Sequence, residues 1–244
     1  MGLLDQLSDQ QCEAVQTIDD DLEIIACAGA GKTGVVTRRI INILKSKSEI
    51  LPENIAAFTF TRKAAEELKG RIYDLGKREL GDTIGFAHMY IGTIHGFCIK
   101  MLQEYIPEFQ KYDVLDEIHT KLFVERYYGE CGMKDLDLCK YKETNLFVSV
   151  MSILNENWFE QDKWERTRTA YKKYKEKLYA EKKFDYSLIL QEMICQLENN
   201  IEFAQIIADK VKYLTVDEYQ DINPIQERLI RRLKELGANL CVVG

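Results

Sequence analysis

One short loop of small residues constrains the fold of this chain more than any other feature. An apolar run at 22–26 leads into small residues that end at Gly31, and a helical pattern begins with Lys32 and Thr33. In a strand, loop and helix of this kind, backbone N–H groups and the helix N-terminus face an anion. The lysine reaches the β- and γ-phosphates of a nucleotide, and the threonine hydroxyl can bind Mg²⁺. The stretch therefore predicts a phosphate-binding loop.

The loop departs from the general pattern Gly-x-x-x-x-Gly-Lys-Ser/Thr at one position, because Ala26 replaces the first glycine. Small residues still fill the loop, so its backbone can approach a phosphate closely. The alternative is a small-residue turn with a solvated lysine, but the strand, loop and helix context favours the phosphate loop. The predicted nucleotide contacts are Ala26, Cys27, Ala28, Gly29, Ala30, Gly31, Lys32, Thr33 and Gly34.

Composition restricts the class of protein. The 244 residues are 46% hydrophobic and 30% charged, as in ordinary globular proteins, and no apolar run is long enough to span a membrane. The N-terminus lacks a signal-peptide profile, so we expect a cytoplasmic protein with no membrane partner. Seven cysteines without a Cys-x-x-Cys pair argue against a disulfide framework and against a structural metal. With a formal net charge of −7, any DNA binding must come from local groups.

The rest of the chain alternates apolar runs with amphipathic helical patterns. Strands are predicted at 22–26, 55–60, 89–94, 211–216 and 239–243. Short apolar strands that alternate with helices form a parallel sheet covered on both faces. The segment from about 100 to 190 has long helical patterns and no convincing strand. The predicted fold class is therefore α/β, a parallel-sheet P-loop NTPase core with an all-helical insertion.

A basic stretch within the insertion allows two interpretations. Residues 163–183 hold nine Lys or Arg against three Glu, interleaved with Trp164, Tyr171, Tyr174 and Tyr179. Basic residues mixed with aromatic ones suit a strand of nucleic acid. The helical spacing of Tyr171 and Tyr174 favours the other interpretation, in which the aromatic residues form the packed face of a helix and the lysines are solvated.

Two adjacent carboxylates follow the apolar strand at 211–216. In a nucleotide hydrolase, Asp217 would hold Mg²⁺ together with Thr33, and Glu218 would orient and deprotonate the attacking water. Lys32 and Glu218 are therefore the predicted catalytic residues. Although the insertion separates them in the chain, both motifs must then meet at the C-terminal edge of one sheet. The alternative is an exposed acidic turn.

Five segments, taken in order, resemble the motifs of the N-terminal half of UvrD/Rep-type superfamily 1A DNA helicases. Segment 7–11 resembles the Q motif, 26–33 the phosphate loop, 58–65 motif Ia, 92–97 motif Ib, and 216–221 the Asp-Glu-x-Gln-Asp signature. The resemblance implies a RecA-like domain 1A made of residues 1–97 and 191–244, with the helical subdomain 1B at 98–190. Five motifs in the same order are hard to obtain by chance.

The resemblance also implies an activity and a set of binding residues. The whole protein would hydrolyse ATP with Mg²⁺, move 3′ to 5′ on single-stranded DNA, and act at junctions of single- and double-stranded DNA. Gln11 would hydrogen-bond the adenine base. The predicted DNA-binding residues are Phe60, Thr61, Arg62, Thr93 and His95.

Three positions depart from the family pattern. Gly34 stands where the family commonly has an arginine that packs on the adenine, Arg62 stands where asparagine is usual, and Cys27 replaces a usual glycine. Because Gly244 directly follows an apolar strand, we also expect the sequence to be a fragment that lacks the second RecA-like domain. That domain supplies arginine fingers in the family, so the isolated chain should be nearly inactive.

Two other functions remain open at this point. One is a P-loop kinase or small-molecule ATPase in which the helical insertion is a lid over the substrate. The other is a nucleotide-binding regulatory module that never turns over. The Phe-Thr-Phe-Thr segment at 58–61 and the Gly-Thr-Ile-His segment at 92–95 favour the helicase, because a kinase has no reason for them.

Overall fold

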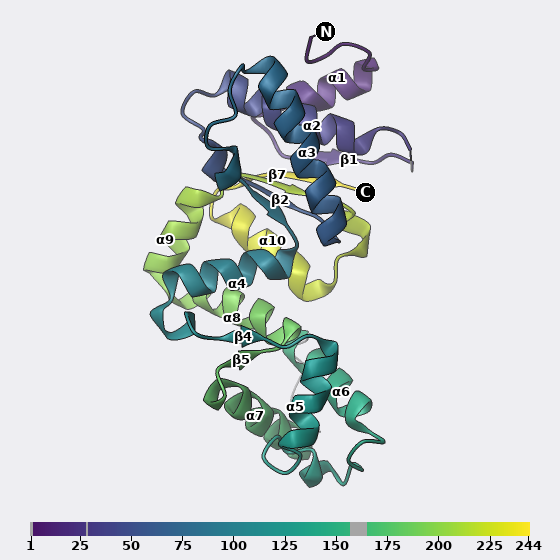
Figure 1. Ribbon diagram of the computed structural model, residues 1–244, viewed down its shortest axis with the longest axis vertical. Coiled ribbons are helices and arrows are strands. Elements are labelled where there is room, and N and C mark those ends of the chain that lie inside the picture. Colours follow the sequence, from purple (N-terminus) through teal and green to yellow (C-terminus); the bar gives the residue numbers. More distant parts are fainter. Residues whose placement is uncertain (1, 28, 157–164) are drawn as a thin grey trace. The chain divides into compact units, whose positions relative to one another are not determined.

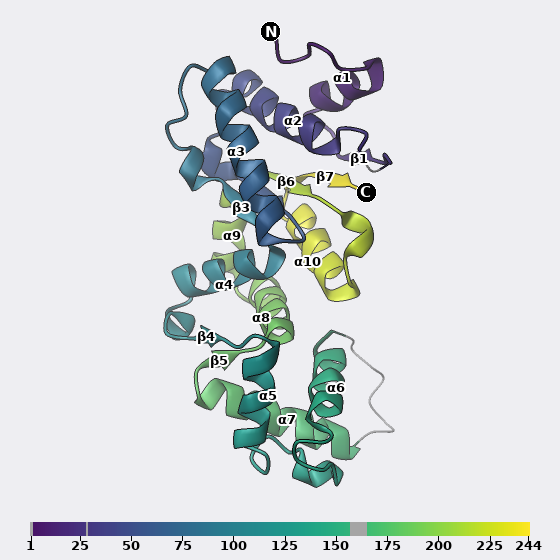
Figure 2. The same ribbon diagram turned by 45° about the vertical axis from the view of Figure 1, so that its right-hand side comes forward.

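The computed structural model describes residues 2–27, 29–156 and 165–244, and the chain divides into two compact units (Figures 1 and 2). One unit consists of Met1–Phe97 with Asn200–Gly244 and is called the core unit below. The other consists of Cys98–Asn199 and is called the inserted unit. Each is described by itself.

A five-stranded parallel sheet forms the centre of the core unit. Its strands, in spatial order, are β1 (Leu22–Ile24), β7 (Asn239–Val243), β6 (Tyr213–Val216), β2 (Ile55–Phe58) and β3 (Tyr90–Gly92). Every neighbouring pair is parallel, which confirms the predicted α/β class. All four residues of β2 are buried, as expected for a central strand with both faces covered.

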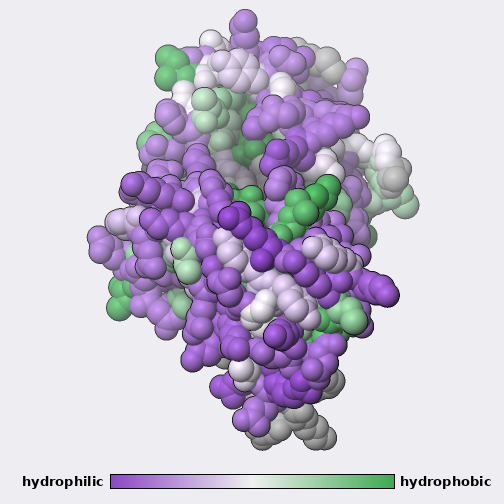
Figure 3. Space-filling model, turned by 60° about the horizontal axis from the view of Figure 1, so that its bottom comes forward, coloured by the Kyte–Doolittle hydropathy of each residue, from purple (hydrophilic) through white to green (hydrophobic). Residues whose placement is uncertain are grey.

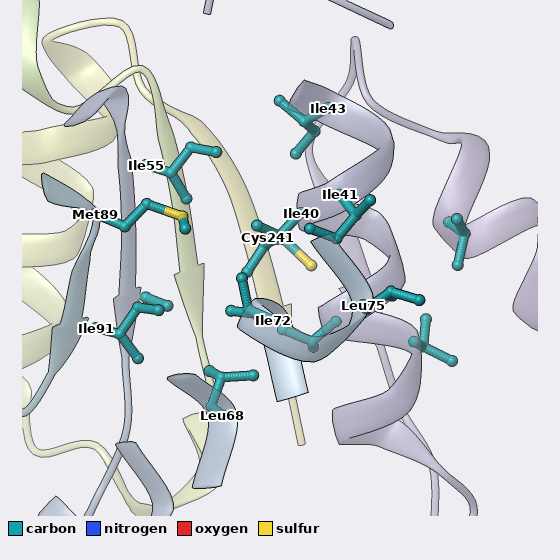
Figure 4. Packing of buried hydrophobic residues seen from close by; sticks show 14 of the residues in the cluster. Ile40, Ile41, Ile43, Ile55, Leu68, Ile72, Leu75, Met89, Ile91 and Cys241 are labelled. Atoms are coloured by element: carbon teal, nitrogen blue, oxygen red, sulfur yellow. The ribbon is translucent and has the colours of Figure 1, made fainter. Parts of the chain in front are cut away.

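Helices cover both faces of this sheet. The core-unit helices are α1 (Asp9–Gln16), α2 (Lys32–Ser46), α3 (Arg62–Glu79), α9 (Ile201–Lys210) and α10 (Pro224–Glu235), and α4 (Ile94–Tyr105) begins in this unit. Helices α2 and α3 pack on one face and α10 on the other (Figures 1 and 2). Ile40 and Ile41 of α2 and Ile72 of α3 meet Ile55 and Ile91 of the strands in the core (Figure 4). The apolar sides of α2 and α3 therefore pack on one face of the sheet and form its hydrophobic core there.

The packing of α3 gives a stability prediction. A Cβ atom on the buried Gly76 would lie 2.6 Å from Cζ of Phe86, whereas one on Gly70 would meet nothing within 4 Å. Gly76→Ala should therefore lower the free energy of unfolding by about 1–3 kcal/mol, because the ring must shift in a packed core. Gly70→Ala, the control in the same helix, should raise it by about 0.5–1 kcal/mol. Thermal denaturation checks both, and equal melting temperatures for the two variants would contradict the packing.

The inserted unit is mostly helical. Beyond the end of α4 it contains α5 (Glu117–Arg126), α6 (Thr144–Glu156), α7 (Glu165–Ala180) and α8 (Tyr186–Asn199). It also contains a parallel pair of two-residue strands, β4 (Asp113–Val114) and β5 (Lys183–Phe184), so the prediction of an all-helical insertion is corrected in this detail. A two-residue strand is too short to show the alternation of apolar and polar residues by which strands are predicted from sequence. Helix α8 continues through Leu190, the predicted last residue of the insertion, and ends at Asn199.

The basic stretch of the inserted unit is largely neutralised by its neighbours. Among the described residues, Lys173 pairs with Asp135 at 2.7 Å and Lys177 pairs with Glu130 at 2.8 Å. Tyr174 is fully buried, and its hydroxyl donates a hydrogen bond to Asp185 at 2.6 Å. These contacts agree with the packed-face interpretation of the aromatic residues. Trp164 lies outside the described residues.

The described surface is that of a polar protein. On the face shown in Figure 3, hydrophilic residues predominate and hydrophobic ones form small separate patches. Among the described helices, none combines the length and the apolar character needed to cross a membrane.

Candidate nucleotide-binding site

The predicted phosphate loop and the acidic pair lie at the same edge of the core sheet. The loop follows the carboxyl end of β1, and Asp217 follows the carboxyl end of β6. Strand β7 lies between them, with Val243 opposite Ile24 and Val242 opposite Val216. Since neighbouring strands are about 4.8 Å apart, the two strand ends are separated by about 10 Å. A bound triphosphate can span this distance.

The end of β7 holds the entrance of the loop. The N–H of Gly244 donates to the carbonyl of Ile24 at 3.0 Å, and the N–H of Ala26 donates to the carbonyl of Gly244 at 3.1 Å. The ladder between β1 and β7 therefore continues to the first residue of the loop. This pairing positions the loop relative to the strand between it and the acidic pair.

The loop itself turns through two glycines in the left-handed region. Gly29 has φ 83° and Gly31 has φ 84°, values that L-residues with a side chain rarely adopt. Gly31 occupies the N-cap of α2, and no side chain caps that end of the helix. The N–H groups of the first turn, which includes Lys32 and Thr33, are therefore available to an anion. Cys27 is an exposed free thiol at the start of the turn. Ala28 lies outside the described residues.

Gln11 connects α1 to this loop. Its side-chain oxygen accepts a hydrogen bond from the N–H of Ser8 at 3.0 Å, while the Ser8 hydroxyl accepts one from the N–H of Gln11 at 3.3 Å. The Gln11 amide nitrogen donates to the carbonyl of Ala30 at 3.0 Å. The residue therefore caps α1, as its position predicts, and its amide also contacts the phosphate loop.

Asp217 is held between two adjacent strand ends. Its N–H donates to the carbonyl of Phe58 at 2.9 Å, and its carboxylate accepts the N–H of Glu218 at 3.1 Å. Burial raises the pKa of Asp217, the neighbouring charge of Glu218 raises it further, and the charge of Lys32 lowers it. The effect of Lys32 means that the structure brings the loop lysine and the strand-end aspartate within electrostatic reach of each other.

Glu218 has an unusual backbone conformation. Its φ of 52° and ψ of 48° lie in the left-handed region, where residues other than Gly, Asn and Asp are rare. The carboxylate accepts a hydrogen bond from the side-chain amide of Gln220 at 2.5 Å. Gln220 belongs to the short helix Tyr219–Asp221 that follows Glu218. Strained residues of this kind cluster at functional sites. The unusual conformation of Glu218 therefore favours a functional role for this residue over the alternative of an exposed acidic turn.

The raised pKa of Asp217 leads to a pH-dependent stability prediction. A carboxyl whose folded pKa exceeds its unfolded pKa destabilises the fold when it is ionised, and this penalty disappears as the pH falls through the folded pKa. Asp217→Asn keeps the oxygen that accepts the Glu218 N–H and removes the charge. Its melting temperature should therefore exceed that of the wild type at pH 7, and the difference should shrink on acidification towards pH ~4. Thermal unfolding at several pH values measures this, and a difference that grows in acid contradicts it.

The predicted DNA-binding residues lie after the neighbouring strands β2 and β3. The N–H of Thr59 donates to the carbonyl of Gly92 at 2.9 Å, so the two segments begin side by side at the carboxyl edge of the sheet. Phe60 is 67% exposed, which is unusual for a phenylalanine and leaves its ring open to a ligand. His95 is partly buried, and burial lowers its pKa. It is therefore neutral at pH 7.

Thr61, Arg62 and Thr93 complete this group. The Thr61 hydroxyl accepts the N–H of Ala64 at 3.1 Å and caps α3, and Arg62 begins that helix with its side chain exposed. The Thr93 hydroxyl accepts the N–H of Gly96 at 3.2 Å. Both threonine hydroxyls therefore satisfy backbone groups at helix starts. The sequence motifs did not reveal these capping contacts.

Comparison with known proteins agrees with this arrangement. The family model described as UvrD/REP helicase N-terminal domain matches residues 7–244. The chain belongs to the UvrD/REP helicase family. This helicase-family chain is 31% identical to the ATP-dependent DNA helicase PcrA of Bacillus subtilis, over 99% of the chain and 33% of that relative. It is 29% identical to the proteins of the same name from Staphylococcus epidermidis and Staphylococcus aureus, over its whole length and about a third of theirs.

The chain therefore spans about a third of the length of the curated relatives it matches.

Arg38 of this UvrD/REP helicase domain is a further residue near the loop that the sequence motifs did not indicate. Its guanidinium lies beside Gly34, on the first turn of the helix that follows the phosphate loop. Helical periodicity could have indicated this contact, because residues four apart lie on the same face of a helix. The motif pattern, however, ends before residue 38.

Proposed function

We propose that this chain is the N-terminal ATP-binding part of an ATP-dependent DNA helicase. The observation that carries the proposal is that the loop before Lys32 and the carboxylate of Asp217, from motifs at opposite ends of the chain, follow strands separated only by β7 at one edge of the sheet. A lysine on a glycine-rich loop and a carboxylate beyond a neighbouring strand are the groups that hold a magnesium nucleotide. The relatives that match this chain carry the name ATP-dependent DNA helicase.

The residues present fit Mg²⁺ and ATP. The uncapped first turn of α2 suits the phosphates, and Thr33 and Asp217 offer the hard oxygen ligands that Mg²⁺ prefers. When bound, the ion would neutralise charge on the β- and γ-phosphates. Lys32 would bind the phosphate oxygens, and Glu218 would orient the attacking water and accept its proton. Gln11 would reach the base once it releases the carbonyl of Ala30.

The same sheet edge would carry the DNA. The exposed ring of Phe60 can stack on a base, and Arg62 can bind a phosphate. Thr61, Thr93 and the neutral His95 would complete a track for single-stranded DNA. Movement along that strand, with 3′ to 5′ polarity, and action at duplex junctions follow from the proposed family function.

We also assign the core unit to RecA-like domain 1A and the inserted unit to subdomain 1B. A second RecA-like domain, carried by the part of the relatives that this chain does not match, would be the partner that completes the site. An arginine finger is worth about 10³–10⁵ in rate, so this chain by itself should bind Mg·ATP weakly and hydrolyse it barely. Domain closure is also needed for strand separation.

The test is the ATP hydrolysis rate of the full-length protein with and without single-stranded DNA. We expect strong stimulation by single-stranded DNA and little by a small-molecule phosphate acceptor. A kinase or small-molecule ATPase predicts the reverse, and a regulatory module predicts no turnover under either condition. Strand separation is then measured on a duplex with a 3′ single-stranded tail, with a 5′-tailed duplex as the control for polarity.

A further inference from the structure

The side chain of Arg38 folds back along α2 to the turn that follows the phosphate loop. Its Nη1 donates to the carbonyl of Gly34 at 3.4 Å, and a Cβ atom on Gly34 would lie 3.3 Å from the same nitrogen. Helical side chains tilt toward the N-terminus, so residue 38 naturally covers the surface over residue 34. The absence of a side chain at Gly34 leaves room for the guanidinium there.

The guanidinium is anchored by backbone oxygens, and its flat faces stay open. Its Nε donates to the carbonyl of Leu3 at 3.1 Å, so both printed contacts are to backbone oxygens. Within the part of the chain that the structure describes, no carboxylate pairs with Arg38 and no aromatic ring stacks on it. Hydrogen bonds to a guanidinium lie in its plane. They therefore fix the orientation of the plane and leave its faces for a further contact.

This group lies next to the predicted phosphate site. Gly34 directly follows Lys32 and Thr33, and Gln11 approaches the loop from α1, with its amide nitrogen 3.4 Å from the position of a Cβ on Gly31. Leu3, which holds Arg38, belongs to the same N-terminal segment as Gln11. A nucleotide with its phosphates on the loop can extend its base along the first turn of α2, towards Gln11 and Arg38.

We propose that Arg38 contacts the base of the bound nucleoside triphosphate, with its guanidinium plane packed against the ring. This inference rests on the proposed nucleotide site and names the residue that selects the base. It differs from the family pattern described above, in which the arginine directly follows Gly-Lys-Thr. In this chain the same chemical group reaches the surface of that turn from Arg38. A larger ring offers more area for stacking, so purines should bind better than pyrimidines.

The test separates binding of the base from binding of the phosphates. Dissociation constants are measured for the full-length protein with Mg²⁺ and ATP, CTP or inorganic tripolyphosphate. Arg38→Ala should weaken ATP binding by about 3- to 30-fold, the range expected for a cation on an aromatic face. Its affinity for tripolyphosphate should change less than about 2-fold. Arg71→Ala, at an exposed position of α3, is the matched control and should change neither affinity.

A second variant covers the case in which Arg38→Ala perturbs the fold. Gly34→Arg combined with Arg38→Ala places the guanidinium directly on the first turn and should restore the preference for ATP over tripolyphosphate. Equal weakening of ATP and tripolyphosphate by Arg38→Ala, with no recovery in the double variant, would overturn the role of Arg38. So would unchanged ATP binding. A wild-type protein that binds neither ligand overturns the nucleotide site itself, which is a different result.

Discussion

Replacing Lys32 by alanine is expected to lower the rate of ATP hydrolysis by the full-length protein by on the order of 10²–10³-fold. The lysine begins α2 beside the uncapped loop, and its charge reaches Asp217 across the sheet edge. Without it, the loop compensates the charge on the phosphates through backbone N–H groups alone. Binding of Mg·ATP should weaken as well, because a charge-assisted contact to phosphate is lost.

The matched control for this variant is Lys45→Ala in the same helix. Lys45 pairs with Glu79 at 3.2 Å near the other end of α2, away from the loop. Its loss should leave hydrolysis unchanged. DNA-stimulated phosphate release and equilibrium nucleotide binding measure both variants. If Lys32→Ala hydrolyses ATP as fast as Lys45→Ala, the loop is not a phosphate site.

Glu218→Gln should separate hydrolysis from binding. Removing a general base lowers a rate by about 10²–10⁴-fold, whereas the amide keeps the size of the side chain and an acceptor oxygen for Gln220. Binding of Mg·ATP should therefore stay within about 3-fold of the wild type, because the phosphate contacts are intact. The single-turnover rate and the dissociation constant are the two measurements.

Glu227→Gln on α10 is the control for this second variant. Glu227 pairs with Arg231 at 2.6 Å on an exposed helix face, and it follows the same strand as Glu218 in the chain. We expect it to leave the rate unchanged. A Glu218→Gln variant that retains full hydrolysis would show that another group accepts the proton, while one that loses nucleotide binding would indicate a structural role for the strained turn.

The strands and the location of the candidate site could be predicted because they depend on local patterns. The apolar runs predicted as strands at 22–26, 55–60 and 211–216 contain parallel strands that end at Ile24, Phe58 and Val216. Their carboxyl ends lie at one edge of a sheet. Once that edge is recognised, the loop at Lys32 and the carboxylate of Asp217 must lie near each other. In the structure, the strands that precede the loop and Asp217 both pair with β7.

The details of the inserted unit could not be predicted from the same patterns. Its two strands are two residues long and pair Asp113 with Lys183, which lies 70 residues further along the chain. The spacing of the aromatic residues in α7 favoured a packed face with solvated lysines, but it did not reveal that Asp135 and Glu130 pair with those lysines. Ion pairs between segments this far apart in the chain have no signature in either segment alone.

Residue chemistry and spacing in the sequence thus predicted the parallel sheet, the small-residue loop before Lys32 and the acidic strand end, because periodicity and small-residue turns are properties of neighbouring residues. Only tertiary packing anchored the guanidinium of Arg38 on the carbonyl of Leu3, and turned Glu218 into the left-handed region. Only packing buried Arg39 against Asn239, at 3.0 Å. These features depend on contacts between residues that are far apart in the chain. Such contacts are determined by how the helices pack on the sheet.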